Sequence, residues 1–178
     1  MALRKETHVK GLVGTIRCQP ANAPASTLIP LYEELTAASP EFADAGGDLS
    51  YLRMLCWYDV PDSLAAAQKL LASQPSSLAR ISVVALGLLR NGDPKQALAL
   101  YEGKQIDWAS APLPWRAVRI AVLRANGREE EASSLASKID QRQLRPEERA
   151  LIAPAKGSPS SKSPPASVKP PTKPSAKL

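Results

Sequence analysis

Two stretches of this chain repeat the same arrangement of residues at a fixed distance. Asn91-Gly92 and Asn126-Gly127 each follow a run of apolar residues, and the two pairs lie 35 positions apart. Ala97 and Ala132 keep the same offset. A period near this length is typical of stacked helix pairs, each of which buries its apolar face against the next. The sequence therefore predicts an all-α helical-repeat domain.

The Asn-Gly pairs predict how the repeated helices end. Glycine has no Cβ and adopts the left-handed conformation that closes many helices without steric cost. Gly92 and Gly127 are therefore expected to have positive φ. After Gly92, Asp93 is an N-cap residue and Pro94 suits the first position of a helix, where no backbone donor is lost.

Apolar residues spaced by three and four positions predict helices in much of the rest of the chain. The expected helices cover about 28–38 and begin near Asp48, Asp62, Ser76 or Ser77, Pro94, Pro114, Glu129 and Pro146. The helix over 78–89 is apolar nearly all round, so it should be covered on more than one side. Trp57 and Trp115 fall on apolar faces and are expected to pack in the core, whereas Trp108 lies in a link and could contact a partner.

For residues 1–25 the sequence predicts an irregular segment without helix or strand. A short strand over Val9–Ile16 is an alternative, but Gly11, Gly14 and the two prolines that follow favour an irregular lead-in. His8 is expected to be a solvated loop residue.

Residues 154–178 differ in composition from the chain before them. They contain seven of the 17 prolines, five lysines and no acidic residue, so they carry +5 of the formal net charge of +6. Such a segment cannot bury enough apolar surface to offset the entropy of ordering its backbone. The sequence therefore predicts a disordered tail after a helical domain over 26–153.

The repeats resemble those of tetratricopeptide (TPR) proteins, in which about 34 residues form two antiparallel helices. Gly92, Ala97 and Tyr101 match the turn, the small residue and the aromatic residue of one unit, and Gly127 and Ala132 match the next. An earlier unit fits more loosely, through Trp57, Ala66 and Leu70. The chain resembles the C-terminal end of a larger bacterial TPR protein, with about three units arranged as a solenoid.

The resemblance implies a scaffold that binds a protein or peptide segment in a concave groove. The groove positions carried over from the family are Tyr51, Tyr58, Ser82, Leu89, Arg90 and Arg124. Members that bind chaperone tails hold the partner's terminal carboxylate with lysine and asparagine. Of the corresponding residues here only Arg90 is suitable, so a clamp of that kind is not favoured.

An alternative reading assigns the function to the tail. Lysines separated by proline and serine would form a cationic arm for nucleic acid or another polyanion. The tail also contains a PxxP spacing, Pro171 to Pro174, of the kind that binds aromatic grooves. Outside the tail the charge is +1, so a nucleic-acid-binding fold is not indicated.

The sequence offers no residues for catalysis or cofactor binding. It has no glycine-rich phosphate loop, no zinc-like cysteine spacing around Cys18 or Cys56, and a single histidine outside the repeats. We therefore expect a protein that is not an enzyme, with no cofactor, metal or small-molecule substrate. The sequence shows neither a signal peptide nor a membrane-spanning segment, which favours a cytoplasmic location.

Replacing Gly92 or Gly127 by alanine tests the repeat. In either position a Cβ should clash in the left-handed turn and lower the free energy of unfolding by about 1–2 kcal/mol. Thermal melts of Gly92→Ala and Gly127→Ala measure the effect. The two losses should be similar, and a neutral effect at one position with a severe effect at the other would contradict the repeat.

Overall fold

The computed structural model describes residues 2–153, with side chains from residue 5, and this part of the chain is helical without strands. The predicted disorder of the tail falls on residues 154–178, outside the described residues. The elements are α1 (Ala2–Arg17), α2 (Ala25–Ala38), α3 (Ala43–Leu55), α4 (Val60–Ser73), α5 (Leu78–Arg90), α6 (Pro94–Ala99), α7 (Leu113–Ala125), α8 (Glu129–Ala136), the 3-10 turn η1 (Gln141–Gln143) and α9 (Pro146–Ile152).

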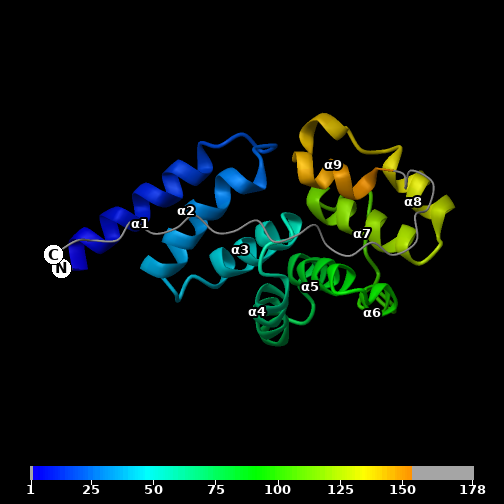
Figure 1. The fold of residues 1–178 in the computed structure, drawn as a ribbon, viewed down its shortest axis with the longest axis horizontal. Coiled ribbons are helices and arrows are strands. Elements are labelled where there is room, and N and C mark those ends of the chain that lie inside the picture. The colour runs from blue at the N-terminus through cyan, green and yellow to red at the C-terminus, as the bar shows by residue number, and fades with distance from the viewer. Residues whose placement is uncertain (1, 154–178) are drawn as a thin grey trace, which may run out of the picture.

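Helices that follow one another in the chain mostly pack side by side (Figure 1). Helix α2 contacts α3, α3 contacts α4, α5 contacts α6, and α7 contacts α8. In addition, α3 contacts α5 and α5 contacts α7, so these three helices form an inner row. Helices α1 and α8 lie toward the two ends of the long axis.

The three helices of the inner row end in the same turn. The residue with positive φ is Trp57 (58°) after α3, Gly92 (86°) after α5 and Gly127 (74°) after α7, again 35 positions apart. In each turn this residue's amide donates to the carbonyl three residues earlier, and the next amide donates to the carbonyl five residues before it. The predicted caps at Gly92 and Gly127 are confirmed, and tryptophan takes the place of glycine in a third turn.

The second helices of these pairs share a small buried residue. Ser63, Ala97 and Ala132 each stand four residues after the N-cap of α4, α6 and α8, and their exposures are 3%, 0% and 0%. A small side chain lets the two helices of a pair approach closely. In the first pair the small buried residue is Ser63 and not Ala66, which was assigned to this unit from the sequence and is exposed. Ser63 lies 34 positions before Ala97 rather than 35, because the α3–α4 turn holds one residue more than the α5–α6 turn.

Helix α5 forms the centre of the largest core cluster. Every residue from Ile81 to Leu88 is buried, and α3, α4, α6 and α7 contact this helix. The prediction that it is covered on more than one side is therefore confirmed. Its N-cap is Ser77, one of the two serines expected there, and its side chain accepts from the amide of Arg80.

The predicted irregular lead-in over residues 1–25 is wrong for its first part, because Ala2–Arg17 form helix α1. Val9, Leu12, Val13 and Ile16 follow the spacing i, i+3, i+4, i+7 and pack against α2 and α3. Gly11 and Gly14 lie on the exposed side, where glycine weakens a helix by only about 0.5–1 kcal/mol each. The alternative of a strand is wrong for the same reason.

Two predicted helix starts were placed too late in the sequence. Helix α2 begins at Ala25 rather than near residue 28 and includes Pro30. Helix α3 begins at Ala43, so Asp48 lies inside the helix and is not its cap. The first turn of α3 was not predicted, because Gly46 and Gly47 follow it closely and glycine has a low helix propensity.

The C-terminal part of the described chain folds back on the N-terminal part. The Glu147 carboxylate accepts a hydrogen bond of 3.1 Å from the amide of Ala25, at the start of α2. The Asn22 side chain donates to the carbonyl of Arg142 at 3.1 Å, and the Arg145 guanidinium donates to the carbonyl of Ala23. Helix α9 and the turn before it are therefore bonded to the start of α2.

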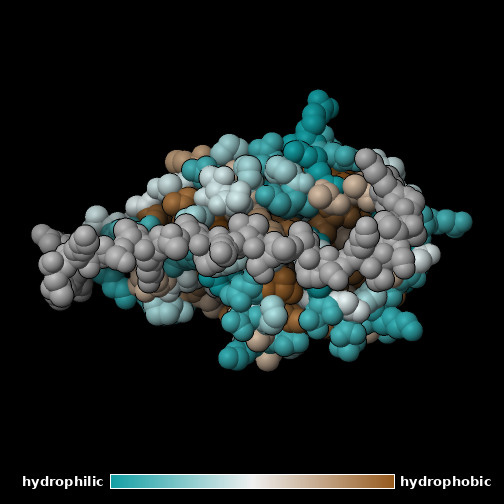
Figure 2. Space-filling model, in the orientation of Figure 1, coloured by the Kyte–Doolittle hydropathy of each residue, from teal (hydrophilic) through white to brown (hydrophobic). Residues whose placement is uncertain are grey.

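The surface of the described chain is largely hydrophilic on the face shown in Figure 2, with separate apolar areas between polar ones. No helix among the described residues is long and apolar enough to cross a membrane.

At Gly87, helix α5 closely approaches side chains of α3 and α4. A Cβ built there would lie 2.7 Å from Leu64 Cδ1 and 2.8 Å from Met54 Sδ. We expect Gly87→Ala to lower the free energy of unfolding by about 1–3 kcal/mol through overpacking. Gly14→Ala is the matched control, because a Cβ there meets nothing within 4 Å. That variant should stabilise helix α1, and equal denaturant midpoints for both variants would contradict the proposed packing.

Candidate functional site

The structure places the six predicted groove residues in different environments. Two of them, Tyr51 and Ser82, are 5% and 0% exposed and belong to the core, so their assignment to a binding groove is wrong. The Tyr51 hydroxyl donates to Glu148 at 2.9 Å, and its ring meets Trp115 edge-on with centroids 5.2 Å apart. Ser82 accepts a hydrogen bond of 3.3 Å from Tyr101. The inner row is curved enough for α3 and α7 to touch, which a linear repeat pattern does not reveal.

Arg90 binds the end of a neighbouring helix. Its Nε donates to the Met54 carbonyl at 3.2 Å and its Nη2 donates to the Leu55 carbonyl at 3.4 Å. These carbonyls close α3, where the helix dipole favours a cation. Burial lowers the pKa of Arg90 to about 10, so the guanidinium stays charged at neutral pH. The charge of Arg90 is thus used within the protein.

The three other predicted residues differ in their surroundings. Arg124 donates to the carbonyl of Ile152 and pairs with Glu129 at 3.1 Å, which fixes the end of α9. Leu89 is half-buried against the main core. Tyr58 is 51% exposed and is available to a partner.

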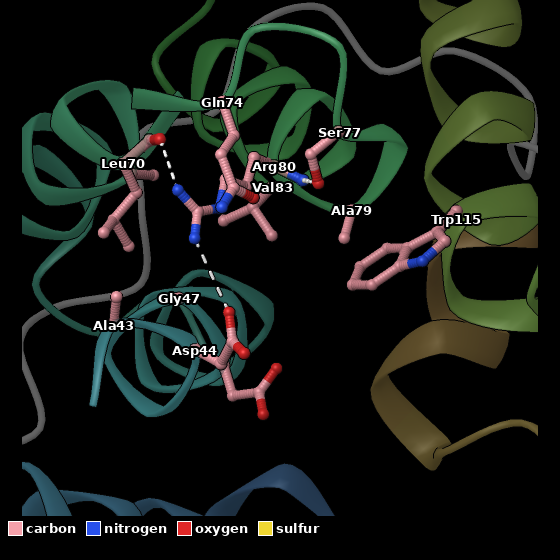
Figure 3. Close-up of a pocket in the computed structure, with 12 residues that line it drawn as sticks. Ala43, Asp44, Gly47, Leu70, Gln74, Ser77, Ala79, Arg80, Val83 and Trp115 are labelled. Carbon is pink, nitrogen blue, oxygen red and sulfur yellow. Dashed lines mark hydrogen bonds and ion pairs between the residues drawn. The ribbon is translucent and has the colours of Figure 1, made fainter. Parts of the chain in front are cut away.

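A cavity of about 180 Å³ opens between α3, α4, α5 and α7 (Figure 3). Figure 3 shows the Asp44 carboxylate facing the Arg80 guanidinium, with the Trp115 ring projecting toward them from α7. The lining residues are Ala43, Asp44, Gly47, Asp48, Ala67, Leu70, Gln74, Ser77, Ala79, Arg80, Val83 and Trp115. Apolar walls with a few charged groups are typical of binding sites.

Arg80 is held in place while its acidic partner is open to solvent. Its Nη1 donates to the Leu70 carbonyl and to the Ser73 hydroxyl, each at 2.7 Å. Its Nη2 lies 3.5 Å from an Asp44 carboxylate oxygen. The Arg80 side chain is 12% exposed and that of Asp44 is 81% exposed, so the ion pair contributes little stability. Asp44 can therefore turn toward a bound group without loss to the fold.

Asp48 stands between this cavity and a second one of about 220 Å³. The second cavity also shares Trp115 and is otherwise lined by α2, α3, α7 and α9. The Tyr32 hydroxyl donates to Asp48 at 3.0 Å. Withdrawal from water raises the pKa of the Asp48 carboxyl, the hydrogen bond from Tyr32 opposes this rise, and the charge of Asp44 adds to it. Asp48 as a whole residue is exposed, at the rim of both cavities, so the rise in its pKa comes from the neighbouring walls and not from full burial.

Glu148 closes the floor of the second cavity. It is 2% exposed and accepts hydrogen bonds from the Tyr51 hydroxyl and, at 2.9 Å, from the Arg145 amide. The Arg145 guanidinium lies 3.7 Å away. A buried carboxylate with these partners fixes helix α9. No local sequence pattern distinguishes this buried glutamate from its neighbour Glu147.

The turn between α3 and α4 carries two exposed aromatic residues. Trp57 is 54% exposed and Tyr58 is 51% exposed. The prediction that Trp57 packs in the core is wrong, because its left-handed backbone turns the side chain outward. Trp115 is partly buried, and Trp108 packs edge-on against Tyr101 at 5.4 Å.

The described residues contain no group of three or more histidines, cysteines or acids placed to hold a metal ion. His8 lies on α1, not in a loop, and its Nε2 is 3.0 Å from Glu34 on an exposed surface. Comparisons with protein-family models, with curated proteins and with solved structures gave no match.

Asp48→Asn tests the electrostatics of the cavities. Because the folded pKa of Asp48 is raised, the folded state binds this proton more tightly than the unfolded state, and stability falls as pH rises between the two pKa values. Asparagine removes this loss and can still accept the bond from Tyr32. We expect the variant to melt higher than the parent at about pH 7 and equally at about pH 3, below the ordinary carboxyl range. The same difference at both pH values would contradict the raised pKa.

Proposed function

We propose that this chain is a non-enzymatic protein–protein interaction module whose helix pairs form a TPR-like solenoid. The repeated turns at Trp57, Gly92 and Gly127 and the small buried residues of the second helices support this arrangement. Each pair presents its first helix to the inner row, as stacked helical repeats do. Helix α9 then acts as the terminal cap of the array.

The observation that carries the proposal is the cavity in which Asp44, Arg80 and Trp115 converge from three helices of the inner row. Trp and Arg are enriched at the centres of protein interfaces, because they combine apolar area with polar contacts. A fixed guanidinium and a solvent-exposed carboxylate beside an aromatic ring would orient a polar side chain or a backbone amide of the partner.

The size of the cavity favours a peptide over a small molecule. Sites for drug-sized ligands enclose about 300–1,000 Å³, whereas the two cavities that share Asp48 and Trp115 measure about 180 and 220 Å³. Each volume suits one side chain. Two neighbouring cavities of this size would therefore receive two anchor side chains from one extended segment, with Trp115 between them.

The alternative, that the basic tail binds a polyanion, stays a prediction from the sequence. Its residues lie outside the described part of the chain, and no described contact favours it. The cytoplasmic location likewise stays a prediction.

Filling the cavity should abolish partner capture. Ala79 lines the cavity and Ala66 is exposed on α4, so Ala79→Trp and Ala66→Trp form a matched pair. We expect the full chain and Ala66→Trp to capture the same proteins from lysate, as identified by mass spectrometry, while Ala79→Trp loses them at an unchanged melting temperature. Capture should survive deletion of residues 154–178, whereas the alternative requires its loss. Normal capture by Ala79→Trp would contradict the proposed site.

A further inference from the structure

The α3–α4 turn displays aromatic side chains at a backbone position suited to glycine. Trp57 occupies the place that Gly92 and Gly127 hold in the equivalent turns, with the same two backbone hydrogen bonds. A residue with a Cβ, and a bulky one above all, is disfavoured at positive φ. Asp59, two residues on, also has a positive φ of 51°. Strained non-glycine residues of this kind concentrate at functional sites.

Trp57 and Tyr58 form a surface that we call the aromatic ledge. Together with Phe42, they are the large apolar side chains that are exposed among the described residues. The Arg90 guanidinium lies over the Trp57 ring, 4.0 Å from its centroid, and Arg53 lies 5.5 Å from the centroid of Tyr58. Each ring thus rests on an arginine and leaves its remaining surface open to solvent.

Both arginines are themselves fixed by other contacts. Arg90 donates to the two carbonyls that end α3, and Arg53 pairs with Glu33 at 2.8 Å and with Asp59 at 3.5 Å. The rings are therefore ordered before any partner arrives. Binding to ordered aromatic rings loses little conformational entropy, which makes such residues strong contact points.

The chemistry of the ledge suits a segment that combines proline with lysine. Proline rings pack on exposed Trp and Tyr faces, as in the aromatic grooves that bind proline-rich peptides. Asp59 and Asp62 are exposed at the start of α4, directly after the rings in the chain. Together with Glu33 they outnumber Arg53 and Arg90, which leaves net negative charge for lysine. An acidic partner would meet these carboxylates and is not favoured.

This chain contains such a segment. Residues 168–174 read Val-Lys-Pro-Pro-Thr-Lys-Pro, with lysines on both sides of a proline pair and no acid. Consecutive prolines favour the extended polyproline II backbone. The described chain ends at Ala153, and the residues that connect it to Val168 span up to about 50 Å when extended. The segment is thus tethered at a high effective concentration.

We propose that the aromatic ledge binds residues 168–174 of the same chain, with Pro170 and Pro171 on Trp57 and Tyr58 and Lys169 and Lys173 near Asp59 and Asp62. This contact goes beyond the proposed function, since it uses the outer end of a helix pair and needs no external partner. It also gives a role to the PxxP spacing at Pro171 to Pro174, which the cavity does not use.

The test follows the indole NH signals of the full chain by NMR. The three tryptophans give separate signals, and Trp57→Phe identifies that of Trp57. We expect Pro170→Ala/Pro171→Ala to shift the Trp57 signal and to leave those of Trp108 and Trp115 unchanged. An excess of a synthetic peptide of residues 164–178 should restore the parent position in this variant. An identical Trp57 signal in parent and variant would overturn the proposal.

Peptide affinity, measured on the Pro170→Ala/Pro171→Ala chain, separates the contributions of the ledge. Adding Trp57→Gly or Tyr58→Ala should weaken binding at least about tenfold, while Phe42→Ala, the exposed aromatic control, should not change it. A peptide with Lys169→Gln and Lys173→Gln should bind about three- to tenfold more weakly. Trp57→Gly should keep a melting temperature within about 4 °C of the parent, because glycine takes this turn without steric cost. An equal loss with Phe42→Ala would contradict the site.

Two further results would overturn the proposal. If the Trp57 signal depends on protein concentration, the tail of a second copy occupies the ledge. If a polyanion shifts the Trp57 signal of the parent to the position of the tail variant, and the peptide does not bind, the tail has another ligand. The cavity variant Ala79→Trp should leave the Trp57 signal unchanged, so failure here and failure of the proposed function are distinguishable.

Discussion

The structure depends on the left-handed turn that closes each helix of the inner row. The hydrogen bond from the residue after Trp57, Gly92 or Gly127 to the carbonyl five positions earlier reverses the chain in the same way each time. The following helix then returns along the first and presents Ser63, Ala97 or Ala132 at the contact. Because the reversal is the same, α3, α5 and α7 come to lie side by side, and their curvature places Tyr51 against Trp115. The cavities on either side of Asp48 follow from that contact.

The inner row of helices is contacted by α9 of the same chain. Helix α9 places Glu148 beside Tyr51, where a family resemblance would place a partner. A buried carboxylate is costly unless its hydrogen bonds are satisfied, and Tyr51 and Arg145 satisfy them. The same contacts reduce the predicted groove to two cavities of side-chain size. The α3–α4 turn, by contrast, accepts backbone strain and exposes two rings. Neither the buried carboxylate nor the strained turn is required by the repeat of helix pairs. Both therefore bear on the binding sites proposed above.

The period and the glycine caps could be predicted because they depend on local backbone chemistry. Asn-Gly at 91–92 and 126–127 and Pro at 94 and 146 placed four helix boundaries correctly. The third left-handed turn was not predicted, because Trp57 occupies the position that glycine holds in the other two turns. Helix α1 was not predicted, because its two glycines disfavour a helix despite its regular stripe of apolar residues. The burial of Tyr51, Ser82 and Glu148 could not be predicted, for it arises from contacts between residues about 20 to 100 positions apart. Of the six predicted site residues, Tyr58 alone is exposed. Arg90 contributes to the same surface because its guanidinium lies over the Trp57 ring.

The contacts between residues 22–25 and 142–148 also affect how the protein comes apart. In an open array each unit touches only its neighbours, so the end units can fray one at a time and stability grows with the number of units. Here the start of α2 and the loop before it are also bonded to α9 and the turn before it, through Asn22, Ala25 and Arg145. Opening α2 therefore breaks contacts of α9, and opening α9 breaks contacts of α2. The helices from α2 to α9 are thus joined in a closed circuit and should exchange their amide hydrogens as one cooperative unit, whereas α1 lies outside this circuit and can fray by itself.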